Sequence, residues 1–176
     1  TLPITDALTT STLTKLAART IGHAEQFWIK FTQGRGQDGR FPLAADQFAV
    51  RTRGGEQEPT ALGQAYFELD NSFGRLESEV DVFSERMPEA EAVVRRIRQA
   101  RFDLKFIVQQ KDRNFVFWVE RRGRGIYLQA SPVDVSGLLK EKLFDKVETC
   151  VLTSATLSTS GSFNFIRDRL GLEKSK

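Results

Sequence analysis

The spacing of apolar residues predicts a mainly helical chain. Apolar positions recur at steps of three and four from Thr12 to Gln33, which is the period of an amphipathic helix. Pro59 and Pro88 each suit the first turn of a helix, because proline lacks only an amide that has no partner there. Since helical spacing resumes after Pro88, we expect an antiparallel hairpin of two helices that turns near Arg86. Its first helix has a coiled-coil-like seam with alternating steps of four and three, formed by Leu62, Tyr66, Leu69, Phe73, Leu76, Val80, Phe83 and Met87.

After Asn114 the pattern changes from helical spacing to that of β-strands. The residues from Asn114 to Glu120 are mostly aromatic or β-branched, and a second run of this kind extends from Ile126 to Ala130. The turn Arg121-Arg122-Gly123-Arg124-Gly125 separates the two runs. The sequence therefore predicts two neighbouring strands joined by a basic turn.

A further strand is expected closer to the C-terminus. Asp134 or Ser136 can cap a helix, and Val147 to Leu152 has the composition of a buried strand. Strand, helix and strand in this order indicate a parallel crossover unit. Ser162 to Leu170 is expected to be helical, with Gly171 as its left-handed stop. The predicted fold class is α+β, mainly helical.

Charge is distributed unevenly along the chain. The 176 residues carry a net charge of +3, and 40% of them are hydrophobic, which suffices for one domain or two small ones. Between Glu68 and Glu91 there are eight acidic and two basic residues, a net charge of −6. Between Arg95 and Arg124 there are ten basic and three acidic residues, a net charge of +7. The basic stretch is either a footprint for a polyanion or the partner of the acidic stretch, and the sequence favours neither.

The cysteine, histidine and apolar content excludes several kinds of site. Cys150 is the only cysteine, so this chain forms no disulfide, zinc site or four-cysteine iron-sulfur cluster by itself. His23 has no second ligand at metal spacing, so no metal site is predicted. No apolar run approaches the ~20 residues that span a bilayer, so no membrane partner is expected. A cytoplasmic location fits these features best.

Hydroxyl residues cluster where the last predicted strand ends. The run Val151-Leu152-Thr153-Ser154-Ala155-Thr156-Leu157 follows a strand-like segment and precedes a serine- and glycine-rich helix entry. A strand exit of this kind is a suitable place to sense a nucleotide. Small polar residues at such a place also commonly cap the next helix, which is the structural alternative.

Together with the segments on either side, this run resembles a helicase family. The upstream segment Ser131 to Ser136 and the downstream segment Gly161 to Leu172 match motifs of the DinG/XPD (Rad3-like) family of superfamily 2 DNA helicases, in the same order. In that family the Thr-Ser-Ala-Thr element is motif III, which links the ATP site to DNA movement and performs no bond chemistry. The resemblance assigns this coupling role to Thr153, Ser154, Ala155 and Thr156.

The resemblance also implies an architecture and an activity. Residues 1–122 would form a helical arch insertion domain with short β elements, and residues 123–176 a partial RecA-like motor segment. The intact enzyme would use ATP and Mg²⁺ to translocate 5′ to 3′ on single-stranded DNA, with the arch helping to enclose the strand. Many relatives carry a 4Fe-4S cluster, which would lie elsewhere in a full-length chain.

Two motifs that ATP hydrolysis requires in this family are absent. The sequence contains no Gly-x-x-x-x-Gly-Lys-Ser/Thr phosphate loop and no Asp-Glu-Ala-His box. We therefore expect an inactive piece of a helicase that holds no cofactor itself and needs the other motor segments as partners. Strand edges without their neighbours would pair with another molecule, such as a second copy of the chain, or remain poorly ordered.

Arginines and aromatic residues gather around the predicted β-turn. Cations that contact phosphates and rings that stack on bases together hold single-stranded nucleic acid. The alternative is a solvated turn over a strand whose aromatic residues are core, which is the commoner situation for a residue such as Trp118. The candidate nucleic-acid-binding residues are Arg121, Arg122, Arg124 and Trp118, which lie beside Tyr127, together with Arg35 and Arg40 in an upstream glycine-rich loop.

A different class of function is also compatible with these patterns. The hydrophobic seam could bind a partner helix in a non-catalytic interaction module, in which the basic stretch would be incidental. A nucleic-acid-binding module that never belonged to a motor is a further alternative. Measuring the affinity for single-stranded DNA at low salt distinguishes the first alternative from the helicase hypothesis, because a module that binds only protein should show little affinity.

Overall fold

The computed structural model describes residues 4–32, 37–53, 56–154, 156–158 and 161–172. It divides into two compact units. Unit 1 consists of Thr1–Lys111 and Phe117–Ala130, and unit 2 of Asp112–Val116 and Ser131–Lys176. The mainly helical α+β character predicted from the sequence is confirmed.

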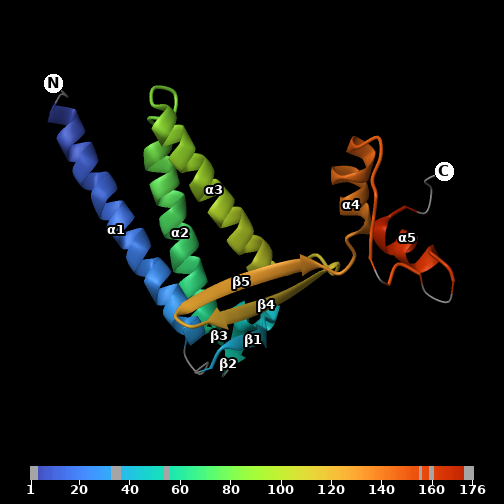
Figure 1. Ribbon diagram of the computed structural model, residues 1–176. Helices are drawn as coiled ribbons and strands as arrows, with labels where there is room; N and C mark the ends of the chain where they lie inside the picture. Colours follow the sequence, from blue (N-terminus) through green and yellow to red (C-terminus); the bar gives the residue numbers. More distant parts are fainter. Residues whose placement is uncertain (1–3, 33–36, 54–55, 155, 159–160, 173–176) are drawn as a thin grey trace. The chain divides into compact units, whose positions relative to one another are not determined.

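Long helices dominate unit 1. Helix α2 (Ala61–Asp81) packs against both α1 (Ile4–Thr32) and α3 (Pro88–Gln109), and a short turn joins α2 to α3 (Figure 1). Pro88 occupies the first turn of α3, and the turn lies where the sequence predicts it. The predicted helical hairpin is therefore present.

The boundaries of α2 differ from the predicted ones. Pro59 is the last residue of strand β3 (Glu56–Pro59), and the helix begins after Thr60, whose Oγ1 accepts a hydrogen bond from Gly63 N at 3.0 Å. At the other end α2 stops at Asp81, so Phe83 and Met87 lie outside the helix although they continue its seam. The apolar spacing continues past the end of α2, but the helix stops at Asp81 because the chain must reverse direction before α3 begins at Pro88.

Ion pairs connect the acidic face of α2 to the basic face of α3. Arg101 binds both carboxylate oxygens of Asp70, at 2.9 and 3.2 Å, and contacts Glu77 at 2.8 Å. Arg98 contacts Glu77 at 2.7 Å and Asp81 at 2.9 Å. For these two arginines the structure favours the pairing alternative over a free polyanion footprint.

A small antiparallel sheet lies at one end of the helices, in the order β1 (Gly39–Pro42), β4 (Phe115–Arg122) and β5 (Gly125–Pro132) (Figure 1). Only Gly123 and Arg124 separate β4 from β5, which is the tight hairpin that the basic turn predicts. Strand β1 pairs with β4 in the register Arg40↔Glu120 and Pro42↔Trp118. A second hairpin is formed by β2 (Val50–Arg53) and β3, after the 3-10 helix η1 (Ala45–Phe48).

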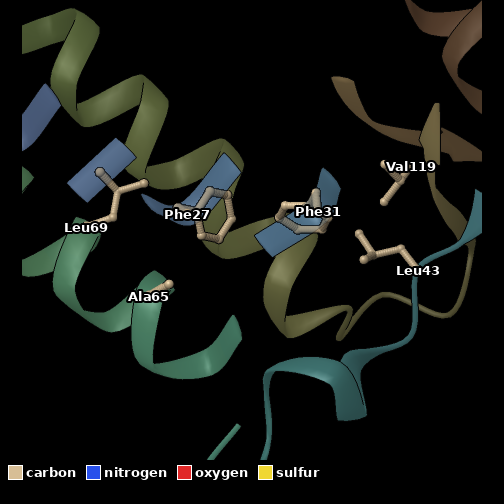
Figure 2. Close-up of a cluster of buried hydrophobic side chains, with 6 residues drawn as sticks. All are labelled: Phe27, Phe31, Leu43, Ala65, Leu69 and Val119. Carbon is tan, nitrogen blue, oxygen red and sulfur yellow. The ribbon is translucent and has the colours of Figure 1, made fainter. Parts of the chain in front are cut away.

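The core joins the helices to the sheet. It contains buried side chains from α1, α2, β4 and the segment after β1, as Figure 2 shows. Phe27 and Phe31 from α1 are fully buried, and their rings meet edge to face with centroids 5.1 Å apart. The remaining members are Leu43, Ala65, Leu69 and Val119.

Unit 2 contains short helices, namely α4 (Ser136–Lys142), the 3-10 helix η2 (Phe144–Lys146) and α5 (Asn164–Leu170). Asp134 Oδ1 accepts a hydrogen bond from Ser136 N at 2.9 Å, and this bond lowers the pKa of the Asp134 carboxyl. Gly171 ends α5 with a φ of 73°, as predicted, and a Cβ there would lie 2.5 Å from Ser136 O. Glycine therefore serves both the left-handed turn and the contact with α4.

The strand predicted over Val147 to Leu152 is wrong for this structure. None of these residues is in a strand, and Val151 is 82% exposed. Cys150, predicted to be buried in that strand, is exposed as well. A parallel strand is stable only when a neighbouring strand completes its hydrogen bonds, and the described residues supply no such neighbour here. The predicted parallel crossover is therefore not formed.

Candidate nucleic-acid interface

The outer face of the sheet in unit 1 brings predicted binding residues together. Along β4, Phe117 and Val119 belong to the core and its border. Because successive side chains of a strand point to opposite faces, Trp118, Glu120 and Arg122 lie on the other face. The sequence predicts two of these three as nucleic-acid-binding residues.

Strand β1 adds Arg40 to the same face, directly opposite Glu120. Arg40 Nε contacts Glu120 Oε1 at 3.2 Å, and its guanidinium carbon lies 5.8 Å from the centre of the Trp118 ring. Arg122 Nη2 contacts the same Glu120 oxygen at 2.9 Å. We call Arg40, Trp118, Glu120 and Arg122 the sheet-face cluster.

Glu120 controls the charge of the sheet-face cluster. Its side chain is 11% exposed, and the hydrogen bonds from Arg122 and then Arg40 lower its pKa. It therefore remains ionised and offsets one of the two guanidinium charges. Glu120 is not among the binding residues predicted from the sequence, although its spacing of two residues from both Trp118 and Arg122 places all three on one face of a strand.

Trp118 is less available than the sequence suggests. The ring is half-buried, and Nε1 is buried without a hydrogen-bond partner among the described residues. Arg40 lies against the ring. Tyr127 is the more accessible ring, with 49% exposure. Tyr127 lies on the same face of the sheet as the sheet-face cluster, because its neighbours Ile126 and Leu128 pack against the core on the other face.

The other predicted arginines are placed differently. By alternation Arg121 falls on the opposite face of β4 from Arg122, and its Nε donates to Gly123 O at 3.5 Å. Arg124 is exposed in the hairpin turn, and Arg35 lies outside the described residues. The turn is tied to the start of β1, since Gly123 N donates to Asp38 Oδ1 at 2.9 Å. The structure thus brings Arg40 and Arg122 together, but not Arg121.

The predicted coupling residues lie in unit 2. Thr153, Ser154 and Thr156 are exposed, and Ala155 is outside the described residues. Thr156 N donates to Ser154 Oγ at 3.2 Å, and the two hydroxyl oxygens are 3.3 Å apart. Both contacts are local, because the two residues that they join are only two positions apart.

Comparison with curated proteins finds relatives that share part of this chain. It is 27% identical over 112 residues to the ATP-dependent DNA helicase YoaA of Haemophilus influenzae, and this alignment covers 60% of the chain and 18% of that protein. It is 39% identical over 59 residues to the 3'-5' exonuclease DinG of Bacillus subtilis, covering 31% and 6%. It is 31% identical over 104 residues to the probable ATP-dependent helicase YpvA of the same organism, covering 59% and 16%.

These similarities confirm the resemblance stated from the sequence, since the curated homologues are DinG-family proteins that include ATP-dependent helicases. The chain spans less than a fifth of the length of each of the three. No protein-family model matches the chain, and no solved structure matches it significantly. Within the described ranges, none of the helices has the length and hydropathy required to cross a lipid bilayer.

Proposed function

We propose that this chain is a segment of a DinG-type ATP-dependent DNA helicase and that unit 1 binds single-stranded DNA. The similarity to helicases carries the first part of the proposal. The sheet-face cluster supports the second, because it presents two guanidinium groups on the same face of the sheet as the half-exposed ring of Tyr127. Cations that follow the phosphates and a ring that stacks on a base suit a strand of nucleic acid without sequence preference.

In this proposal the helices of unit 1 are the arch that helps enclose the strand. The ion pairs between α2 and α3 fix the two helices side by side, and the core fixes α1 and the sheet to them. Such a body can hold its DNA-contacting residues in constant relative positions, which a translocating enzyme requires. Movement 5′ to 3′ is part of the same proposal.

Residues 153–156 would couple the nucleotide state to DNA movement. Their exposed hydroxyl groups are available to a neighbouring part of a longer protein. The chain has no phosphate loop, so its residues do not fit an ATP and Mg²⁺ site, and we assign them no step of ATP hydrolysis. The nucleotide site, and an iron-sulfur cluster if there is one, would be supplied by other segments.

Removing the two sheet-face guanidiniums is expected to weaken DNA binding. The double variant Arg40→Gln and Arg122→Gln should lower the affinity for fluorescent oligothymidylate about tenfold or more at low salt. The slope of log affinity against log salt should fall by about two, one for each lost phosphate contact. Fluorescence anisotropy at several salt concentrations measures both quantities.

This experiment also includes a variant that is expected to raise the affinity for DNA and a control variant on a distant helix. Glu120→Gln releases both guanidiniums from their carboxylate, so it should raise the affinity and steepen the salt dependence. Arg95→Gln removes a charge from the exposed side of α3 and should have little effect. Equal affinities for the wild type, the double variant and Glu120→Gln would show that the sheet face does not contact DNA.

The coupling role predicts a selective defect in an intact helicase that contains this segment. Thr156→Ala should leave ATP binding nearly unchanged while reducing unwinding about fivefold or more, the lower range of typical coupling between sites. Equilibrium binding of a fluorescent ATP analogue and a strand-separation assay give the two values. A parallel loss of both, or of neither, would contradict coupling through this residue.

A further inference from the structure

A polar cavity lies between α1 and α2 in unit 1, and it shares no residue with the sheet-face cluster. Its volume is about 130 Å³. Two arginines, a histidine, two side-chain amides and one carboxylate surround it, together with an aromatic ring. The lining residues are Arg19, His23, Gln64, Phe67, Glu68, Asn71, Ser72 and Arg75.

Helical spacing brings these side chains to one place. Arg19 and His23 are one turn apart on α1, so they share a face of that helix. On α2, the polar positions 64, 68, 71 and 75 follow steps of three and four and form one stripe. The cavity is therefore built from two regular helices that pack on each other.

The carboxylate in the cavity already has hydrogen-bonding partners, whereas neither arginine is paired with a carboxylate among the residues that the structure describes. Glu68 accepts a hydrogen bond from Gln64 Nε2 at 2.7 Å and lies 3.6 Å from His23 Nδ1. The other ring nitrogen of His23 accepts from Arg19 Nε at 3.4 Å, which orients that guanidinium. Among the described residues Arg75 has no carboxylate partner. Two arginines and one carboxylate give the cavity a net positive charge, which favours binding of an anion.

The floor and the rim of the cavity differ in chemistry. Ser72 is buried and forms the floor. Its hydroxyl already donates a hydrogen bond to Leu69 O at 2.9 Å, so the floor offers a ligand little hydrogen bonding. Recognition must come from the arginines and the amides at the rim. Phe67, 60% exposed, adds an accessible ring to this rim. A planar aromatic ligand group attached to an anion matches this combination.

We propose that this cavity binds the phosphate group of a nucleotide, with Arg19 and Arg75 on the phosphate oxygens and Phe67 against the base. Planar guanidiniums match phosphate geometry and bind it in a bidentate manner. Asn71 contributes an amide donor. The nucleotide is either a unit of a single strand or a free mononucleotide, and both present the same chemistry to these residues.

Titration with thymidine 5′-monophosphate and with inorganic phosphate tests the site. The double variant Arg19→Gln and Arg75→Gln should weaken the binding of both probes about tenfold or more. Phe67→Leu should weaken nucleotide binding about tenfold and leave phosphate binding unchanged, because only the nucleotide can stack. NMR shifts of the side-chain amides of Asn71 and Gln64 report binding at the cavity itself.

Controls keep the outcome clear. The variant Arg95→Gln with Arg96→Gln removes the same charge from α3 and should bind both probes like the wild type. Asn71→Asp places a negative charge in the cavity and provides an independent loss of binding. Circular dichroism verifies that each variant is folded; the substituted arginines are exposed, so their loss leaves no buried gap.

Competition with a ten-residue oligothymidylate identifies the source of the phosphate. Tighter binding of the oligonucleotide assigns the cavity to a DNA strand, and tighter binding of the mononucleotide assigns it to a free nucleotide. Thymidine monophosphate that causes no amide shifts at millimolar concentration, or that binds the double arginine variant like the wild type, would overturn the site. These results leave the sheet-face test untouched, since it uses Arg40 and Arg122.

Discussion

Replacing Phe31 by alanine is expected to lower the free energy of unfolding by about 3–5 kcal/mol, the usual cost of removing a fully buried aromatic side chain. Phe31 is 0% exposed and connects α1 with the side of the core that contains Leu43 and Val119 (Figure 2). Its ring also meets Phe27, Trp28 and Phe48, with centroid distances of 5.1, 5.9 and 6.2 Å. The substitution therefore leaves a cavity where the helices meet the sheet. Urea denaturation followed by circular dichroism measures the loss.

Phe102→Ala on α3 is the matched control for this prediction. Phe102 is 66% exposed, so its truncation should change the free energy of unfolding by no more than about 1 kcal/mol. Alanine is also the better helix former, which offsets part of the lost contact. Similar losses for the two variants would mean that Phe31 is not part of a packed core. The sheet-face cluster should also lose DNA affinity in Phe31→Ala, because β1 and β4 rest on this core.

Local patterns sufficed to predict the helical hairpin and the basic β-turn. The seam from Leu62 to Val80, Pro88 and the opposite charges of the two helices all point to the same arrangement, and the structure contains it. Agreement between independent local signals is what makes a segment predictable from its sequence. The β4–β5 turn was predictable for the same reason.

The segment from Val147 to Leu152 shows the limit of such patterns. Its composition is that of a buried strand, yet composition reports only that a strand could form there. Whether it forms depends on a hydrogen-bonding neighbour, and none of the described residues provides one. The exposed side chains of Val151 and Cys150 are the consequence.

The candidate sites were predictable only in part because they combine distant residues. Arg40 and Glu120 are 80 residues apart, so their pairing depends on the strand register and not on a local motif. Strand alternation could have separated Arg121 from Arg122, since adjacent residues lie on opposite faces. The cavity between α1 and α2 could not be predicted, because it depends on how the two helices are rotated against each other, and the sequence pattern of neither helix alone specifies that rotation.

Arg101→Met is expected to lower the free energy of unfolding by about 2 kcal/mol, less than the ~3–5 kcal/mol for a fully buried pair, because Arg101 is partly exposed. The Arg101 side chain is 34% exposed, and its guanidinium holds Asp70 through two hydrogen bonds and Glu77 through one. Its loss removes both of these hydrogen bonds from Asp70, whereas Glu77 keeps its contact with Arg98 at 2.7 Å. Methionine keeps most of the packing of the arginine stem, so the change isolates the charge. Urea denaturation at neutral pH measures it, with Arg95→Met as the control for an exposed pair.

Two further measurements show whether Arg101→Met destabilises the protein through the loss of ion pairs or through the loss of packing. Adding Asp70→Asn and Glu77→Gln to Arg101→Met removes the charges of both carboxylates that Arg101 held, while Arg98 keeps Asp81 as a partner at 2.9 Å, so at least half of the stability should return. Hydrogen bonds from Arg98 and Arg101 lower the pKa of the Glu77 carboxyl, so the stability it contributes is present above the ordinary carboxyl pKa. That contribution is lost as the pH falls through the lowered pKa of the folded state. The difference between Arg101→Met and the wild type should therefore shrink in acid. A difference that stays constant with pH, together with no recovery in the triple variant, would assign the effect to packing and leave the ion pairs without a measurable role in joining α2 to α3.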